Sequence, residues 1–220
     1  MKPFAQTPRS RVRRLPKRGH YDRETVYRVL DAAFLCHLGY VIGGQPYVTP
    51  TAYWREQGHV YWHGSSKSRM LMAMEKRPQV CLTVSILDGL VLARSGFHMS
   101  VNYRAAMLFG RPFKVEDPAE KLAKMEAFVE RMYPGHWGSL RAVTKQELKA
   151  MTVVGMEIEE ASAKIRTGPP IDDEEDYALP LWAGVIPVRQ SAGAALDDPR
   201  LAAGLERPAR LRDFSHLGLE

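Results

Sequence analysis

Apolar residues recur along this chain with two different periods, and each period predicts a different kind of element. Seven runs rich in aromatic and β-branched residues, bounded by glycine, proline or polar turns, predict strands. These runs are Phe34–Ile42, Tyr47–Trp54, His59–His63, Val80–Leu87, Leu90–Phe97, Tyr103–Val115 and Met151–Ile158. The spacing of the first three predicts an antiparallel meander.

Turn signals and prolines refine these strands. Gln57-Gly58 predicts a hairpin turn, and Asp88-Gly89 predicts a second hairpin between the fourth and fifth strands. Pro50 cannot donate a ladder hydrogen bond, so it indicates an edge, a bulge or a ligand-facing position. Gly110 and Pro112 interrupt the sixth strand.

Four helices are predicted from capping residues and helical spacing. The first follows Asp22, and the second opens at Ser65-Ser66 and ends before Pro78. The third begins at Asp117-Pro118, and the fourth has a capping box of Thr144 and Glu147. Their expected core positions are Val26, Val29, Leu30 and Ala33, then Met70, Leu71 and Met74, then Leu122, Met125, Phe128, Val129 and Met132.

Six or seven antiparallel strands with inserted helices predict a mainly β fold, a closed or half-closed barrel. No strand–GxGxxG–helix unit and no GxxxxGK[ST] loop occurs, which excludes the two commonest nucleotide-binding motifs. We divide the 220 residues into a basic flexible arm at 1–18, a barrel domain at 19–190 and a C-terminal tail at 191–220.

The net charge of +6 is concentrated in the arm, whose seven cations and no acids leave a net charge of −1 for the rest. A basic arm can bind phosphate-rich polymers, but this one has no aromatic interleaving and no nucleic-acid motif. We therefore expect a solvated or subunit-draping tail and no nucleic-acid site.

Cys36 and Cys81 lie far apart and fit neither a CxxC nor a zinc-type spacing, which favours a reduced, cytoplasmic protein. No apolar run approaches the roughly 20 residues that span a bilayer, and the opening lacks the apolar core of a secretory signal. We expect no membrane association.

The candidate chemistry lies where a strand ends at Gly64 and runs into hydroxyls and cations. The residues that follow are Ser65, Ser66, Lys67, Ser68 and Arg69. Small hydroxyl side chains and free backbone N–H groups at a helix start can bind a phosphate, and Arg69 can grip it through two parallel hydrogen bonds. The pattern therefore predicts a phosphomonoester cradle. The residues alone are more typical of an ordinary capped surface helix with exposed cations, and they leave both interpretations open.

Three motifs follow one another in an order found in one protein family. The first is Tyr-Val-Thr-Pro at 47–50, a hairpin, Tyr-Trp-His-Gly at 61–64 and Ser-Lys-Ser-Arg at 66–69. The second is Ser-Val-Asn-Tyr-Arg at 100–104 leading to Leu-Phe-Gly at 108–110. The third is Lys-Ile-Arg at 164–166, Gly-Pro-Pro at 168–170, an acidic run at 172–176 and Leu-Trp-Ala-Gly-Val at 181–185. Over roughly residues 20–190 the chain resembles the pyridoxamine 5′-phosphate oxidase superfamily, and within it the nitroimidazole-resistance (Nim) and flavin-nucleotide-binding branch.

The resemblance implies an FMN-binding split β-barrel that forms a homodimer, with two flavins at the subunit interface and the C-terminal tail packing on the partner. It assigns the isoalloxazine contacts to Tyr47, Val48, Thr49 and Pro50, the ring and ribityl contacts to His63 and Gly64, and the phosphate to Ser68 and Arg69, beside Ser66 and Lys67. Asn102 and Arg104 share a strand face and are further candidates, and Trp182 is a candidate ring-stacking residue of either subunit. The true oxidase has a second cation where this chain has Met70, so we do not expect oxidation of pyridoxamine phosphate.

His63 occupies the position that in Nim proteins is linked to the active site. A protonatable imidazole beside a flavin can tune its potential or pass a proton, which makes His63 the candidate catalytic residue. Alternatively, it only hydrogen-bonds or packs on the ring. Because four residues of a strand span roughly 13 Å, His59 and His63 do not form a metal pair, and we expect no metal site.

Four functional hypotheses follow. The first is an FMN-dependent oxidoreductase that reduces a small nitroaromatic- or quinone-like electrophile, with NAD(P)H as a candidate electron donor. The second is a non-catalytic flavin-binding or carrier protein. The third keeps the barrel but binds haem or a deazaflavin, with His63 or His98 as an axial ligand for haem. The fourth is a nucleic-acid-associated protein led by the arm. The sequence favours the first and leaves the second and third open.

Overall fold

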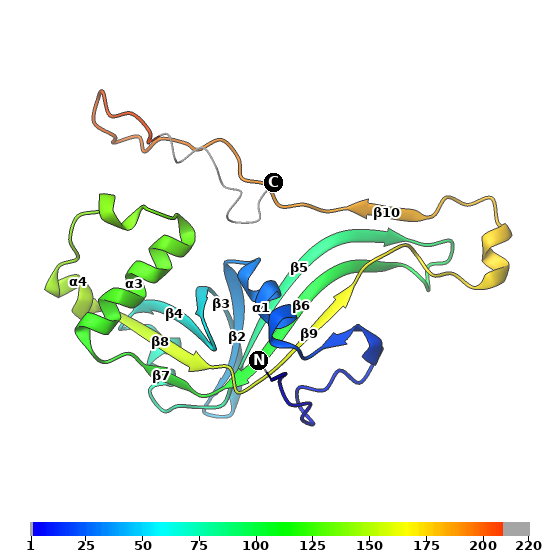
Figure 1. The fold of residues 1–220 in the computed structure, drawn as a ribbon, viewed down its shortest axis with the longest axis horizontal. Helices are drawn as coiled ribbons and strands as arrows, with labels where there is room; N and C mark the ends of the chain where they lie inside the picture. Colours follow the sequence, from blue (N-terminus) through cyan, green and yellow to red (C-terminus); the bar gives the residue numbers. More distant parts are fainter. Residues whose placement is uncertain (1, 209–220) are drawn as a thin grey trace. The chain divides into compact units, whose positions relative to one another are not determined.

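The structure of the protein, a computed structural model, describes residues 2–208. Within that range the chain forms antiparallel strand pairs with helices inserted between them, which confirms the predicted mainly β, split-barrel class (Figure 1). The strands are β1 (Gly19–His20), β2 (Leu35–Ile42), β3 (Gln45–Glu56), β4 (His59–Ser65), β5 (Val80–Leu92), β6 (Ser100–Gly110), β7 (Pro112–Lys114), β8 (Met151–Glu157), β9 (Glu160–Arg166) and β10 (Gly184–Pro187). The helices are α1 (Arg23–Asp31), α2 (Arg69–Met74), α3 (Pro118–Met132) and α4 (Lys145–Ala150), with 3-10 turns η1 (Pro16–Arg18), η2 (Trp137–Ser139) and η3 (Glu174–Ala178).

The strands pair in the order β1-β9-β6-β5-β2-β3-β4-β8-β7, and β10 pairs with β5. Strand β3 joins the two halves of the barrel, because it pairs with β2 from Gln45 to Ala52 and with β4 only from Tyr53 onward. The main core fills the space enclosed by these strands and includes Trp62, Tyr53 and Leu38. None of the described helices is long and apolar enough to cross a membrane.

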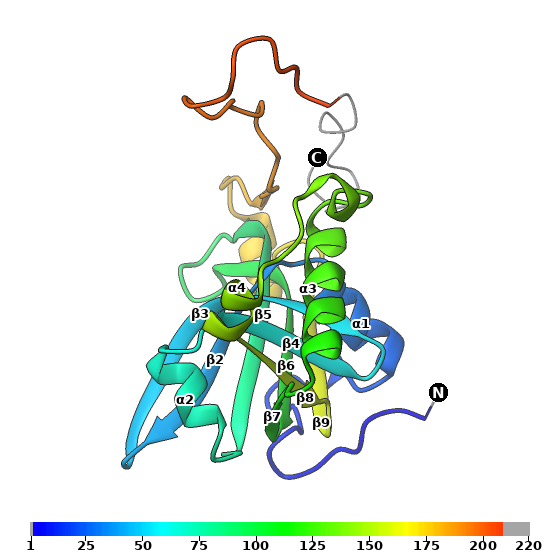
Figure 2. The ribbon, with the colours of Figure 1, turned by 90° about the vertical axis from the view of Figure 1, so that its left-hand side faces the viewer.

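Helix α3 lies against strands of the second half, on the face that points away from the main core (Figure 2). There a smaller apolar cluster of Trp54, Tyr61, Val115 and Val153 meets Phe128 and Met125 of the helix. The predicted cap is confirmed, since the Asp117 side chain accepts a hydrogen bond from the Glu120 N–H. The predicted core face of α3 is only partly confirmed, because no residue of the helix is fully buried.

The chain divides into two compact units. One contains the chain up to Ile86 together with Tyr103–Arg166, and the other contains Leu87–Asn102 together with the chain from Thr167 onward. The predicted C-terminal tail falls in the second unit, and its residues 209–220 lie outside the described part. In the second unit Asp172 is buried and paired with Arg94 at 2.9 Å, so the acidic run is not wholly solvated.

The predicted hairpin at Asp88-Gly89 is wrong. Strand β5 continues through these residues to Leu92, and the chain turns back between Ala93 and Met99. Gly89 lies opposite Pro187 of β10, where an added Cβ would stand 3.2 Å from the Ile186 carbonyl oxygen. The glycine therefore allows β10 to approach β5 closely, although the Asp-Gly dipeptide alone indicates a turn.

The number of strands is larger than the predicted six or seven, with ten in the described residues. Strand β9 was missed because its sequence is rich in alanine and serine, which have little strand preference. Its inward residues Ala161 and Ala163 are completely buried, and helix α1 packs against the strand. Small side chains thus allow the helix to approach closely.

Two further predictions differ from the structure. The second helix begins at Arg69, because Ser65 still pairs with Met151 and the Ser66 N–H binds the Ala150 carbonyl. The arm at 1–18, predicted to be flexible, packs on the barrel: Phe4 is buried, and its ring meets Tyr27 edge to face.

The closest glycine contact in the second half of the barrel gives a test of this packing. A Cβ on Gly155 would lie 2.5 Å from the Phe113 ring and 2.7 Å from the Tyr61 ring. We expect Gly155→Ala to lower the free energy of unfolding by about 1–3 kcal/mol, the usual cost of overpacking, measured by urea titration. Gly138→Ala is the control, since nothing lies within 4 Å of its Cβ position. Equal stability of the two variants would contradict the packing described.

Candidate cofactor-binding site

Strand alternation places the predicted site residues of β3 on two faces. Tyr47 packs against the core and stacks on Tyr40, with 5.7 Å between ring centroids. The Tyr40 hydroxyl shares a hydrogen bond of 3.0 Å with the Thr49 hydroxyl. Val48, 68% exposed, and Pro50 point to the opposite, outer face. Of these four residues, only Val48 and Pro50 present their side chains to a ligand on the outer face.

Pro50 lies where β3 pairs on one side. Its cross-strand neighbour is His37 of β2, whereas β4 joins β3 only from Tyr53. The local edge indicated by the proline is confirmed. Opposite Val48 stands Gly39, which has no side chain on the outer face of β2. A Cβ added there would lie 3.4 Å from the Cys81 carbonyl oxygen.

Arg69 contacts the predicted site segment of β3 directly. Its guanidinium carbon stands 4.5 Å from the centroid of the Tyr47 ring, a cation–π distance. The fold therefore brings together two predicted residues that are far apart in the sequence. Neither Lys67 nor Arg69 has an ion-pair partner among residues 2–208, and Arg69 is exposed.

The turn before Arg69 is built by serine. The Ser68 N–H donates to the Ser65 carbonyl at 2.9 Å, and the Lys67 N–H donates to the Ser65 hydroxyl at 3.2 Å. Helix α2 has only six residues, so its dipole contributes little. The attraction for an anion at this turn comes from the two cations and the hydroxyls of Ser66 and Ser68.

Gly64 and His63 point to opposite faces of β4. A Cβ on Gly64 would lie 3.1 Å from Leu71 of α2, so the glycine allows the helix to pack closely on the strand. His63 faces α3, where its ring meets Phe128 at 4.5 Å and Trp54 at 6.0 Å between centroids. The structure therefore does not place these two neighbours on one surface.

His63 has unusual surroundings for an imidazole. Its Nδ1 atom is buried and has no hydrogen-bond partner in the described part of the chain. Burial among apolar rings lowers the pKa of His63 below its ordinary value, because the charged form loses hydration. At neutral pH the ring is uncharged, and its buried Nδ1 receives no hydrogen bond from the described residues.

The remaining predicted residues lie elsewhere. Arg104 stands opposite Ile165 in the first unit. Asn102 and Trp182 belong to the second unit, where the Asn102 amide donates to the Gly168 carbonyl at 3.1 Å. The Trp182 ring, 69% exposed, covers Gly184, where an added Cβ would stand 2.8 Å from it.

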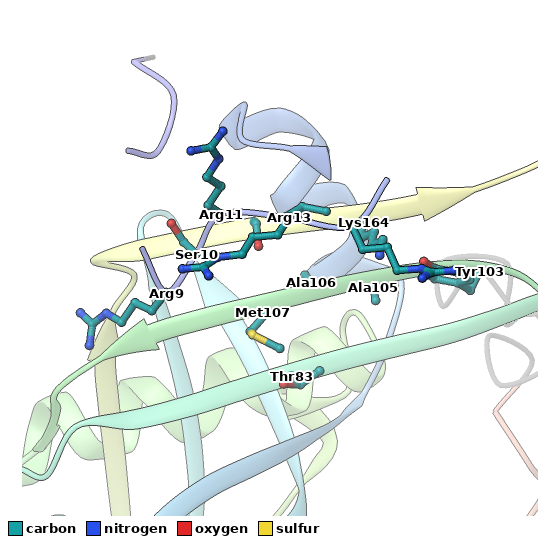
Figure 3. Close-up of a pocket in the computed structure, with 13 residues that line it drawn as sticks. Arg9, Ser10, Arg11, Arg13, Thr83, Tyr103, Ala105, Ala106, Met107 and Lys164 are labelled. Atoms are coloured by element: carbon teal, nitrogen blue, oxygen red, sulfur yellow. The ribbon is translucent and has the colours of Figure 1, made fainter. Parts of the chain in front are cut away.

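One cavity of the first unit was not anticipated from the sequence. It has a volume of about 280 Å³ and lies between the folded arm and the outer faces of β5, β6 and β9 (Figure 3). We call it the arm pocket. Its lining residues are Arg9, Ser10, Arg11, Val12, Arg13, Arg14, Thr83, Tyr103, Ala105, Ala106, Met107, Ser162 and Lys164. The surplus of arginines in the arm was visible in the sequence, but the folding back that forms the pocket was not.

Comparison with known proteins places this geometry in a family. The family model described as pyridoxamine 5′-phosphate oxidase matches residues 22–165, more than half of the chain. The chain belongs to the pyridoxamine 5′-phosphate oxidase family. No curated protein matches it.

Two solved structures are similar over nearly the whole chain. The flavocytochrome Anf3 from Azotobacter vinelandii is 47% identical, with a TM-score of 0.91, covering 95% of this chain and 97% of that one. The FAD and heme binding protein from Mycobacterium smegmatis is 34% identical, with a TM-score of 0.84, covering 89% and 96%. A protein from Bacteroides thetaiotaomicron, described as a 5-nitroimidazole antibiotic resistance protein, is 19% identical with a TM-score of 0.57 and covers 67% and 86%. The last likeness concerns the fold alone.

The lowered pKa of His63 predicts how stability depends on pH. Because the unfolded chain protonates this imidazole more readily than the native one, the free energy of unfolding should fall as pH drops through about 6.5. His63→Gln cannot take up that proton. We expect the loss of stability between about pH 7.5 and about pH 5.5 to be smaller in His63→Gln than in the parent, measured by urea titration. An identical loss of stability in both proteins would contradict a lowered pKa of His63 in the native state.

Proposed function

We propose that the protein binds a flavin through its FMN moiety, with the phosphate at Ser66–Arg69. The observation that carries this proposal is the pair of cations, Lys67 and Arg69, that have no carboxylate partner in the described chain and stand beside Tyr47. Membership of the pyridoxamine 5′-phosphate oxidase family and likeness to a flavocytochrome and to an FAD and heme binding protein support it.

The donor set fits a phosphomonoester. A phosphate dianion accepts several hydrogen bonds, and two cations with small hydroxyls can satisfy it without crowding. Gly39 has no side chain opposite Val48, so a flat ring on the outer face could approach the backbone at this point. In this arrangement Tyr47 holds Arg69 in position, while Pro50 lines the ring face. FAD contains the same FMN moiety, so either flavin suits this site.

We further propose that the protein is an oxidoreductase acting on a small nitroaromatic- or quinone-like electrophile, with NAD(P)H as the electron donor. A bound flavin would supply the electron transfer. The part left to this chain is proton handling at His63, whose neutral ring has an unpaired Nδ1. A carrier without turnover keeps the same binding residues and differs only in lacking that role.

The outer face of β2 and β3 supports the proposal of a homodimer. Leu35, Val41 and Val48 are 60%, 55% and 68% exposed and lie on the same face. An apolar strip of this kind is typical of a subunit interface. It is continuous with the proposed ring face, so a second copy would cover the flavin. A monomeric mass in sedimentation equilibrium at micromolar concentration would contradict this proposal.

Haem is a second candidate ligand, favoured by the flavocytochrome likeness and by one observation on the histidines. The Nε2 atom of His98 lies 3.2 Å from an Asp173 carboxylate oxygen, whereas Nδ1 of His63 has no described partner. A neutral imidazole with an unpaired nitrogen could hold haem iron. Of the two histidines considered, His63 is therefore the better candidate.

Arg69→Ala tests the flavin site. Removing this guanidinium should weaken FMN binding by about 1.5–3 kcal/mol, the range for hydrogen bonds to a charged group, measured by fluorescence titration of the apoprotein. Lys76→Ala is the matched control, since it removes an exposed cation just beyond the end of α2. The proposal fails if Arg69→Ala binds FMN as tightly as the control does.

His63→Ala separates the two ligands by absorption. In freshly purified protein we expect the flavin bands to keep their intensity in the variant, while NAD(P)H-dependent reduction of a nitroaromatic acceptor slows. If His63 also ligates haem, the variant loses a Soret band that the parent shows. Loss of the flavin bands with unchanged turnover per bound flavin would instead make His63 a flavin anchor.

A further inference from the structure

We propose that the arm pocket binds a nucleoside phosphate, in addition to the flavin phosphate at Arg69. The base would lie on the apolar floor of the pocket and the phosphate between Arg13, Arg14 and Lys164. The pocket itself does not depend on the proposed flavin site; only the source of the nucleotide, considered below, rests on that function.

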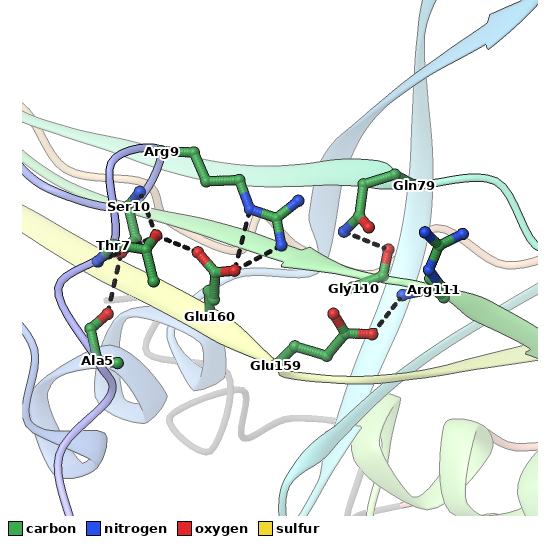
Figure 4. A network of polar contacts seen from close by, with 9 residues as sticks. All are labelled: Ala5, Thr7, Arg9, Ser10, Gln79, Gly110, Arg111, Glu159 and Glu160. Carbon is green, nitrogen blue, oxygen red and sulfur yellow. Dashed lines mark hydrogen bonds and ion pairs between the residues drawn. The ribbon is translucent and has the colours of Figure 1, made fainter.

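The first observation is that the arm is held in place by residues other than these cations (Figure 4). The Arg9 Nε donates to a Glu160 carboxylate oxygen at 3.0 Å, and the Thr7 hydroxyl binds the same carboxylate. The Ser10 hydroxyl donates to the Ala5 carbonyl at 3.0 Å, and the Val12 N–H donates to the Tyr21 hydroxyl at 2.8 Å. These anchors fix the arm without using Arg13 or Arg14.

The second observation is uncompensated charge. Five cations line the pocket and no carboxylate does. Glu160 neutralises Arg9, whereas Arg11, Arg13, Arg14 and Lys164 have no ion-pair partner within residues 2–208. In Figure 3 Arg11 points away from the sheet, while Arg13 extends along it. Like charges gathered at a pocket repel one another unless an anion neutralises them.

The third observation is the chemistry of the floor and walls. Ala105, Met107 and Thr83 present small or apolar surface, and Tyr103 offers an aromatic ring. An inorganic anion makes no favourable contact with apolar surface, whereas a nucleoside base can stack on tyrosine and pack against methionine. The Ser162 side chain adds a hydroxyl for a ribose or phosphate oxygen.

The size of the pocket limits the ligand. About 280 Å³ lies just below the roughly 300–1,000 Å³ of typical small-molecule pockets, so it suits one nucleotide and not a whole dinucleotide. Two sources share this chemistry: the adenylate half of FAD, or the adenylate half of an NAD(P)H electron donor. Both would present the same phosphate and base to the arm.

Calorimetric titration with AMP tests the pocket on the full-length protein. We expect the parent to bind AMP, and the double variant Arg13→Ala/Arg14→Ala to bind it about tenfold or more weakly, since hydrogen bonds from charged groups are lost. The charge-matched control is Lys2→Ala/Lys17→Ala, which removes two arm cations that do not line the pocket. We expect less than about a twofold change in the control and a decline of the parent's affinity with added salt.

The charge-reversed variant Arg13→Glu/Arg14→Glu should abolish AMP binding at an unchanged melting temperature. Two further measurements distinguish the sources. A selective loss of FAD affinity over FMN affinity in Arg13→Ala/Arg14→Ala assigns the pocket to FAD, and a raised KM for NAD(P)H assigns it to the donor. These measurements use other variants than the Arg69→Ala test, so the proposals for the flavin site and for the arm pocket can fail separately.

Two outcomes would overturn the proposal. One is absence of AMP binding by the parent protein, and the other is an equal loss of affinity in the double variant and its charge-matched control. In the first case, salt-sensitive self-association that weakens in Arg13→Ala/Arg14→Ala would assign these cations to the acidic run 173–176 of a second copy.

Discussion

Unpaired positive charge at the serine turn is the feature on which the functional account depends. Most cations on a protein surface are solvated or lie near a carboxylate, and their presence says little. Lys67 and Arg69 differ because Lys67 lies within the serine turn and Arg69 directly follows it, and because Arg69 is held over the Tyr47 ring. A dianionic phosphate in that position would be neutralised by groups that are already in place, which reduces the entropic cost of binding.

The barrel supplies the rest of the site through one strand. Because β3 pairs first with β2 and then with β4, its outer face runs from Val48, opposite Gly39 of β2, to the aromatic cluster at Trp54. His63 lies in that cluster, under α3, on the same outer side as Val48 and Pro50. The proposed ring contacts and the proposed proton carrier therefore share the outer side of the barrel, while Tyr47 and Thr49 anchor the strand from within.

Much of this could be predicted from sequence because the signals are local. The side chains of Asp22, Asp117 and Thr144 each accept a hydrogen bond from the backbone N–H three residues later, and all three caps form as predicted. The features that were missed depend on distant partners. Asp88-Gly89 alone indicates a turn, but in the structure β10 pairs with this part of β5. The sequence of β9 does not indicate a strand, because its small alanines are explained only by the packing of α1 against them. The arm pocket requires Glu160 to hold Arg9, a contact that spans most of the chain.

Comparing the affinity of the apoprotein for FMN and for riboflavin tests the central claim most directly, because the two ligands differ only by the phosphate. If the serine turn and its two cations neutralise that phosphate, FMN should bind at least about a hundredfold more tightly at low salt, and the advantage should shrink as salt is added. Equal affinities for the two flavins would contradict the account.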